Sequence, residues 1–232
     1  MTAASTNSSA SVIFSRFIPA AVLSIAILGA STAPAAERPK DVFVVADMSS
    51  LNAVVTNKAY NEKARKLLLK EIDSLGLDYL DHLHLRTAGA PSAIGEFLPE
   101  WNRDIEFIYR KANPSAVPGF LTKRVHELME TESRSDVDLV WSLQELARAT
   151  RCDSHDTYIF VLTNALEAGR FDGNRFGMPR LIGTPYQGCA SLTLIGFGAG
   201  DQTGSVTRLS SAEKAFRIVV EEAGFARFTI LR

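Results

Sequence analysis

The stretch Asp41-Val-Phe-Val-Val-Ala-Asp47 decides the fold of this chain. It is a continuous run of apolar residues bounded by two aspartates, without alternation between apolar and polar positions. A strand with one face in water alternates, whereas a parallel strand that is covered on both faces is apolar throughout. The stretch therefore predicts a buried parallel strand inside a sheet.

Helical and extended segments alternate along the rest of the chain. In residues 57–75, apolar side chains such as Leu68 and Ile72 share one helical face, and lysines such as Lys66 and Lys70 share the other. The same kind of pattern predicts strands over 79–86, 105–109 (at a sheet edge), 157–163, 192–197 and 226–231, and helices over 119–130, 138–151 and 211–223. Strands that alternate with helices predict an α/β fold, a doubly wound, mostly parallel central sheet with helices on both faces.

The composition limits the classes of protein to consider. Apolar residues make up 46% of the 232 residues and charged residues 22%, which is typical of a chain with a packed core rather than a disordered one. The formal net charge is −1, so no overall positive field attracts a phosphate backbone. We therefore expect no nucleic-acid partner.

The first 36 residues have the pattern of an export signal. Arg16 precedes an apolar run over residues 17–29, and small residues follow up to Ala36. The run is shorter than the roughly twenty residues that a membrane span requires. We expect a signal peptide over residues 1–36, a single domain over residues 37–232 and a periplasmic or secreted location. The alternative is an uncleaved anchor, which would be the protein's only attachment to a membrane.

The two cysteines stand before two predicted neighbouring strands. Cys152 lies a few residues before the strand at 157–163, and Cys189 lies just before the strand at 192–197. If these strands are parallel neighbours, both cysteines lie at the amino end of the sheet. An exported protein meets an oxidising compartment, so the pair predicts a disulfide. Two buried free thiols are the alternative.

Polar residues stand where the predicted strands end, and ligands of such sheets bind at the carboxyl ends of the strands. Asp47-Met-Ser49 follows the first strand, Thr163-Asn164 follows the fourth and Gly196-Phe-Gly198 follows the fifth. An apolar strand that ends in Asp-x-Ser and leads into a helix resembles the opening of a von Willebrand factor A-type domain. The strand end at 161–164 resembles that family's Leu-Thr-Asp-Gly, and the segment 138–143 resembles the one that follows its metal-binding Thr. The resemblance covers residues 40–231.

The resemblance implies a metal-ion-dependent adhesion site. In the family, an Asp-x-Ser-x-Ser loop, a Thr and a second Asp hold Mg²⁺ or Mn²⁺, and a carboxylate of the partner completes the shell. Here Asp47 and Ser49 match, Asn164 stands at the position of the second Asp, and Leu51 stands at that of the second Ser. The Thr position falls on Val137, or on Ser135 after a shift of two residues.

The metal ligands expected from the resemblance are Asp47, Ser49, Asn164 and Ser135. Substitute oxygens are available on Ser50, Asp138 and Glu167. Only one formal carboxylate remains in the pattern itself, and a hard dication binds less tightly as ligand charge falls. In the alternative without a metal, Asp47 and Ser49 cap the first helix or bind loop amides.

Two other groups of residues are candidates for binding. Phe171, Arg175 and Phe176 lie in the long segment 169–186 at the ligand end of the sheet, and residues of these types are enriched at interfaces. The alternative is a variable insertion. His82 and His84 share one strand face and could hold zinc, but no third ligand with suitable spacing is evident, which favours packing or exposure near an edge.

The expected function is that of an exported, noncatalytic von Willebrand A-like module that binds a protein partner. No nucleophile elbow, phosphate loop or dinucleotide fingerprint occurs in the sequence, so we assign no catalytic residue. One alternative is a structural subunit of an envelope assembly that uses helix faces or the segment 169–186. A less favoured alternative is a metal-assisted hydrolase with Asp47 as a ligand, for which no general base is identifiable.

Overall fold

Six strands form one sheet in the order β3-β2-β1-β4-β7-β8 in the computed structural model, which describes residues 38–77, 81–88, 104–106, 138–201 and 205–232. All neighbours pair in parallel except β3, which is antiparallel to β2 at the edge. The strands are β1 (Lys40–Ala46), β2 (His82–Thr87), β3 (Asp104–Glu106), β4 (Asp156–Leu162), β7 (Ser191–Ile195) and β8 (Phe228–Leu231). The predicted α/β fold and the predicted edge strand are thus confirmed.

Strand β1 lies inside the sheet and is buried on both faces, as its continuous apolar run predicts. Phe43 and Val45 pack into the core on one face, and Val42 and Val44 pack into a second core on the other. This arrangement gives the fold its two hydrophobic layers.

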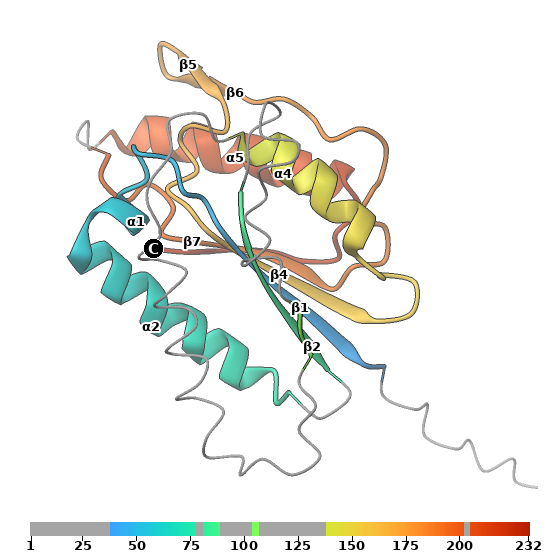
Figure 1. Ribbon diagram of the computed structural model, residues 1–232. Coiled ribbons are helices and arrows are strands. Elements are labelled where there is room, and N and C mark those ends of the chain that lie inside the picture. Colours follow the sequence, from blue (N-terminus) through green and yellow to red (C-terminus); the bar gives the residue numbers. More distant parts are fainter. Residues whose placement is uncertain (1–37, 78–80, 89–103, 107–137, 202–204) are drawn as a thin grey trace, which may run out of the picture. The chain divides into compact units, whose positions relative to one another are not determined.

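The helices are divided between the two faces (Figure 1). Helices α1 (Ala53–Thr56) and α2 (Lys58–Ser74) pack on one side. Helix α4 (Leu139–Leu146), its continuation η3 (Ala147–Ala149) and helix α5 (Val206–Glu222) pack on the other. Each α-helix begins after a polar residue whose side chain accepts a backbone N–H of the first turn: Asn52, Asn57, Asp138 and Ser205.

The observed helices differ from the predicted ones mainly at their ends. The predicted helix 57–75 is preceded by the short α1, and α5 begins several residues before the predicted start at 211. The predicted helix over 119–130, the predicted signal peptide over 1–36 and Ser135 lie outside the described residues. Within the described residues, no helix has the length and apolarity needed to cross a lipid bilayer.

A small hairpin that the sequence pattern did not predict follows β4. Strands β5 (Arg170–Asp172) and β6 (Arg175–Gly177) form a separate two-stranded sheet, with Gly173 at a φ of +57° in the turn. Phe176 faces the core, with its ring centroid 6.3 Å from that of Phe216 on α5. The hairpin therefore packs on the α5 side of the molecule.

The predicted disulfide between Cys152 and Cys189 is confirmed. The two Cα atoms are 4.6 Å apart, and β4 and β7, which follow the two cysteines, are parallel neighbours. The bond therefore lies at the amino end of the sheet. Disulfides persist mainly outside the reducing cytoplasm, so the bond suggests a non-cytoplasmic location.

Candidate functional site

The carboxyl ends of β1 and β4 bring Asp47 and Ser49 together with the loop that begins at Thr163. The Asp47 carboxylate accepts hydrogen bonds from the Ser49 backbone N–H (3.0 Å) and from the Thr163 hydroxyl (2.6 Å). Both bonds are buried. Asp47 is 3% exposed, and within the described residues no lysine, arginine or histidine forms an ion pair with it. A buried carboxylate without a cationic partner is costly, so this group favours a bound cation.

Asn52 links the two strand ends from the centre of the site. Its Nδ2 donates to the carbonyls of Asp47 (2.6 Å) and Leu162 (3.2 Å). Its Oδ1 accepts from the backbone N–H groups of Val54 (3.1 Å) and Asn164 (3.0 Å). One fully buried side chain thereby binds β1, β4 and the first turn of α1 together.

Asn164 lies at the end of β4 next to the loop after β1. Its Nδ2 donates to the carbonyl of Leu51 (2.9 Å), and its Oδ1 accepts from the backbone N–H of Leu166 (3.2 Å). Both the nitrogen and the oxygen of the Asn164 amide therefore form hydrogen bonds within the loops. This arrangement favours a role for Asn164 in holding the Leu51 loop rather than in contacting an ion.

The backbone after β4 contains an uncommon conformation. Ala165 has a φ of +62°, in the left-handed region that residues other than glycine seldom adopt. Its N–H donates to the Thr163 hydroxyl (2.8 Å), which in turn donates to Asp47. Such conformations are concentrated at functional sites, because the surrounding structure has to hold them in place.

Glu167, two residues further on, brings a second carboxylate to the site. Partial burial raises the pKa of Glu167, and the charge of Asp47 raises this pKa further. The Ser49 hydroxyl faces the Glu167 carboxyl and opposes this rise in its pKa. The Ser49 Oγ is buried, and among the described residues it has no partner at hydrogen-bond geometry. Two carboxylates and an unsatisfied hydroxyl thus converge on one place.

These groups fit a hard divalent cation. Mg²⁺ and Mn²⁺ prefer carboxylate, hydroxyl and water oxygens, and Asp47, Ser49 and Glu167 offer such oxygens. Glu167 supplies the second negative charge that the sequence motif lacks at Asn164. Ser50 is exposed on the same loop, whereas Asp138 caps α4 by accepting from the Trp141 N–H (2.8 Å).

The sequence pattern pointed to part of this site. Asp47, Ser49 and Asn164 are brought together, while Ser135 cannot be placed. The sequence predicted Glu167 only as a substitute oxygen ligand, and it did not predict a role for Asn52. The only signal for Asn52 was an asparagine directly before an apolar helical segment, which is typical of a helix N-cap.

The three residues predicted as a contact surface lie on the hairpin in different environments. Phe176 is buried in the core, and Phe171 is half-buried beneath the Arg208 guanidinium, 4.0 Å from its ring centroid. Arg175 is exposed. A binding role for the hairpin stays a prediction, and of these three residues only Arg175 is fully exposed.

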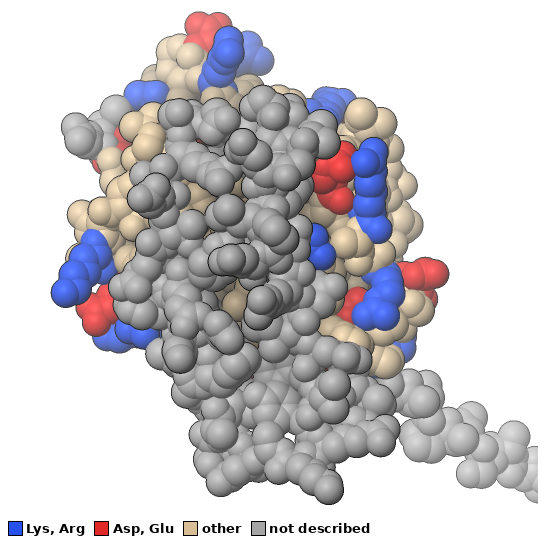
Figure 2. All heavy atoms as spheres, viewed as in Figure 1, with Lys and Arg blue, Asp and Glu red and all other residues tan. Residues whose placement is uncertain are grey.

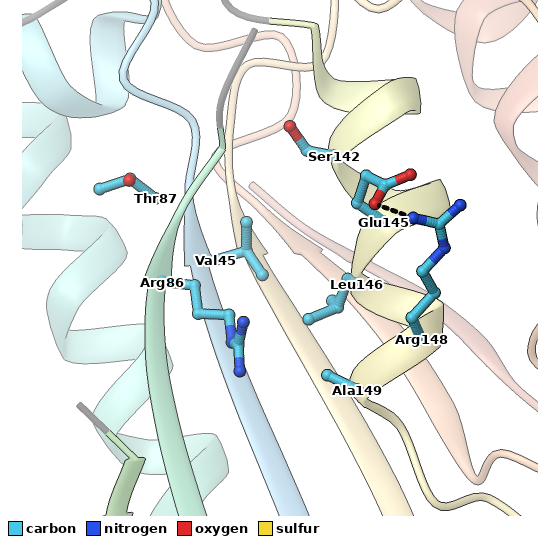
Figure 3. A pocket seen from close by; sticks show the side chains of 8 residues that line it. All are labelled: Val45, Arg86, Thr87, Ser142, Glu145, Leu146, Arg148 and Ala149. Carbon is cyan, nitrogen blue, oxygen red and sulfur yellow. Dashed lines mark hydrogen bonds and ion pairs between the residues drawn. The ribbon is translucent and has the colours of Figure 1, made fainter. Parts of the chain in front are cut away.

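A pocket of about 270 Å³ lies between β2 and α4 on the other side of β1 from α2. Figure 3 shows Arg86 reaching into it from β2, and an ion pair between Glu145 on α4 and Arg148 on η3 (2.7 Å). None of the predicted site residues lines this pocket. On the described surface seen in Figure 2, acidic and basic side chains are intermixed rather than gathered by sign.

Comparison with known proteins finds no family model that matches the chain and no match among the curated proteins.

Proposed function

We propose that this protein is an exported, noncatalytic binding module of the von Willebrand A type that holds Mg²⁺ or Mn²⁺ at Asp47, Ser49 and Glu167. The ion captures a carboxylate of a protein partner. The observation that carries this proposal is the meeting of two carboxylates and an unsatisfied buried hydroxyl at the carboxyl ends of β1 and β4. This is also the edge at which open parallel sheets bind their ligands.

When bound, the metal supplies open coordination positions for an acidic group. The protein's own residues hold the oxygen donors in place and exclude water from beneath them. Thr163 and the Ser49 N–H fix the orientation of the Asp47 carboxylate. The exposed carboxyl of Glu167 closes the outer side of the site.

Leu51 provides an apolar contact beside the proposed ion. Its side chain is 71% exposed, while its backbone carbonyl is held by Asn164 at 2.9 Å. An apolar side chain on a loop that is already ordered costs little entropy on binding. The site therefore suits an acidic side chain of the partner with an apolar residue next to it.

His82 and His155 do not lie beside the proposed ion. His82 begins β2 and His155 immediately precedes β4, so both lie near the amino end of the sheet, away from Asp47. Neither of these two histidines is therefore placed to act as a general base for a metal-bound water at this edge.

We predict that the purified chain binds one Mn²⁺ ion, measured by calorimetry after treatment with a chelator. Glu167→Gln should weaken this binding about tenfold or more, because the variant removes one of two ligand charges. Asp47→Asn should weaken it at least as much. Glu62→Gln, on the exposed surface of α2, is the matched control and should bind as the unchanged protein does.

Circular dichroism and thermal melting of the metal-free variants check that each one folds. Saturable binding that survives both Glu167→Gln and Asp47→Asn would contradict the assigned ligands. The absence of binding up to millimolar Mn²⁺ would reject the ion and leave Asp47 as a residue that only orders the loops.

A structural subunit of an envelope assembly is the second candidate, and the segment 169–186 favours it. Ile182 in this segment is 81% exposed, and Arg175 projects from the hairpin. Partner binding that is unaffected by a chelator but lost in Ile182→Asp would support this candidate. Binding that depends on Mn²⁺ would support the strand-end site instead.

A further inference from the structure

Three potential metal ligands from distant parts of the chain meet at the amino end of the sheet. Asp41 on β1 is the register partner of His82 on β2, and His155 immediately precedes β4, the other neighbour of β1. A ligand atom from each of these residues lies within 4.8 Å of the other two. The parallel register of β1 and β2 is what places Asp41 beside His82.

We propose that Asp41, His82 and His155 form a binding site for a zinc-class transition-metal ion, with water in the fourth position. Two imidazoles and one carboxylate form one of the known three-ligand sets of zinc. The mixed nitrogen and oxygen donors distinguish this site from the oxygen-only site at the opposite edge of the sheet. The proposal does not depend on the function proposed above.

The surroundings of His155 orient its ring for such a role. Its Nδ1 lies 2.9 Å from the Ser154 hydroxyl, which leaves Nε2 as the nitrogen for the metal. Metal-binding histidines commonly use their second nitrogen in a hydrogen bond of this kind. Arg38 donates to the carbonyls of Cys152 (2.9 Å) and His155 (3.1 Å), so the turn that carries His155 is fixed.

The rings of His82 and His155 are 6.2 Å apart between centroids, so both face the same space.

Arg151 is the group that competes with a metal for Asp41. Its guanidinium donates to both carboxylate oxygens, at 2.9 and 2.8 Å. The two oxygens together have about four lone-pair positions, so the carboxylate can keep Arg151 and still bind an ion. The Arg151 side chain is 46% exposed, which also leaves it room to move aside.

His84 lies close to this cluster without belonging to it. It stacks on Phe43 with ring centroids 4.3 Å apart, and its Nε2 is 3.9 Å from Asp41 Oδ1. Its ring also stacks on that of His82, with centroids 6.2 Å apart, so it contacts two of the proposed ligands from the side. We therefore expect His84→Gln to weaken metal binding less than the loss of a ligand histidine does, and we use Glu62→Gln on the exposed surface of α2 as the neutral control.

Both cysteines form the disulfide, so no thiolate is available as a zinc ligand. Zinc bound by this protein must therefore use nitrogen and oxygen donors. X-ray absorption of the zinc-loaded protein should show a shell of nitrogen and oxygen at about 2.0–2.1 Å and no sulfur.

The test is calorimetric titration of the chelator-treated full chain with Zn²⁺. One ion should bind, and His82→Gln and His155→Gln should each weaken binding more than about a hundredfold, since losing an outer-shell partner alone costs about 10- to 100-fold. Glu62→Gln and Glu167→Gln should bind Zn²⁺ within about threefold of the unchanged protein, whereas His84→Gln should weaken binding by about 10- to 100-fold as an outer-shell partner of Asp41. The two ligand histidines are only half-buried, so their variants should keep the melting temperature of the metal-free protein.

Stoichiometric Zn²⁺ binding that persists in both His82→Gln and His155→Gln would overturn the proposal, as would the absence of Zn²⁺ binding. A loss in His84→Gln equal to that in His82→Gln would reject the assigned ligand set. Mn²⁺ binding should be unchanged in His82→Gln, so failure of this proposal can be distinguished from failure of the strand-end site.

Discussion

Asn52→Ala is expected to lower the free energy of unfolding by at least about 3 kcal/mol, because it leaves three buried backbone groups without this partner and removes one of the two donors to the Leu162 carbonyl. Its amide serves two carbonyls and two N–H groups, and it is 0% exposed. Each polar group that loses its partner in the interior costs about 1–3 kcal/mol, reduced where water can enter the space. Urea denaturation followed by circular dichroism measures the loss.

Asn57→Ala is the matched control for this change. Asn57 also caps a helix, accepting from the N–H groups of Ala59 (3.0 Å) and Tyr60 (3.4 Å), but it is exposed. Losing an exposed cap of this kind costs about 1 kcal/mol. Asn52→Asp should also destabilise strongly, because a carboxylate oxygen would face the two carbonyls. An Asn52→Ala cost no larger than that of Asn57→Ala would contradict the central role of Asn52.

Removal of the disulfide by Cys152→Ala together with Cys189→Ala is expected to lower the free energy of unfolding by about 3–4 kcal/mol. The bond joins residues 37 apart in the sequence, so its loss frees a long loop in the unfolded chain. At the size of this protein, the melting temperature should fall by roughly 10 °C. Alanine suits both positions because both cysteines are buried.

The effect of a reductant on the stability of each protein provides the control for the disulfide. Addition of a reductant should destabilise the unchanged protein toward the level of the double variant and leave the double variant itself unaffected. Mn²⁺ binding should be retained in the double variant, because the bond lies at the opposite edge of the sheet from Asp47. A double variant as stable as the unchanged protein would contradict the expected contribution of the bond.

The fold class followed from local patterns in the sequence. The continuous apolar run of β1 required cover on both faces, and the apolar stripe of α2 provided cover for one of them. Both patterns lie within one segment of the chain, so they can be recognised without knowing which elements pack against that segment. The small hairpin of β5 and β6 escaped prediction because its strands have three residues each and its stability depends on packing of Phe176 against α5.

The strand-end site was predictable in part. Asp47, Ser49 and Asn164 stand where predicted strands end, so their positions followed from the sheet alone. Whether their side chains are free for a ligand depends on contacts between the loops: two hydrogen bonds engage the Asn164 amide, and Glu167 lies near Ser49 and Asp47. The bond between Asn164 and Leu51 joins residues 113 positions apart, which no local pattern records.

The sequence by itself determined a buried parallel strand, the helices that cover it and a cysteine pair at one end of two neighbouring strands, because hydrophobic period and strand polarity are local properties. Only the tertiary structure decided which distant polar groups meet. The pairing of β1 with β2 and β4 places Asp41 next to His82 and near His155, and the joining of two strand ends makes Asn52 a central residue. The physical reason is that register and loop closure depend on the packing of the whole sheet, whereas the tendency to form each element belongs to the segment itself.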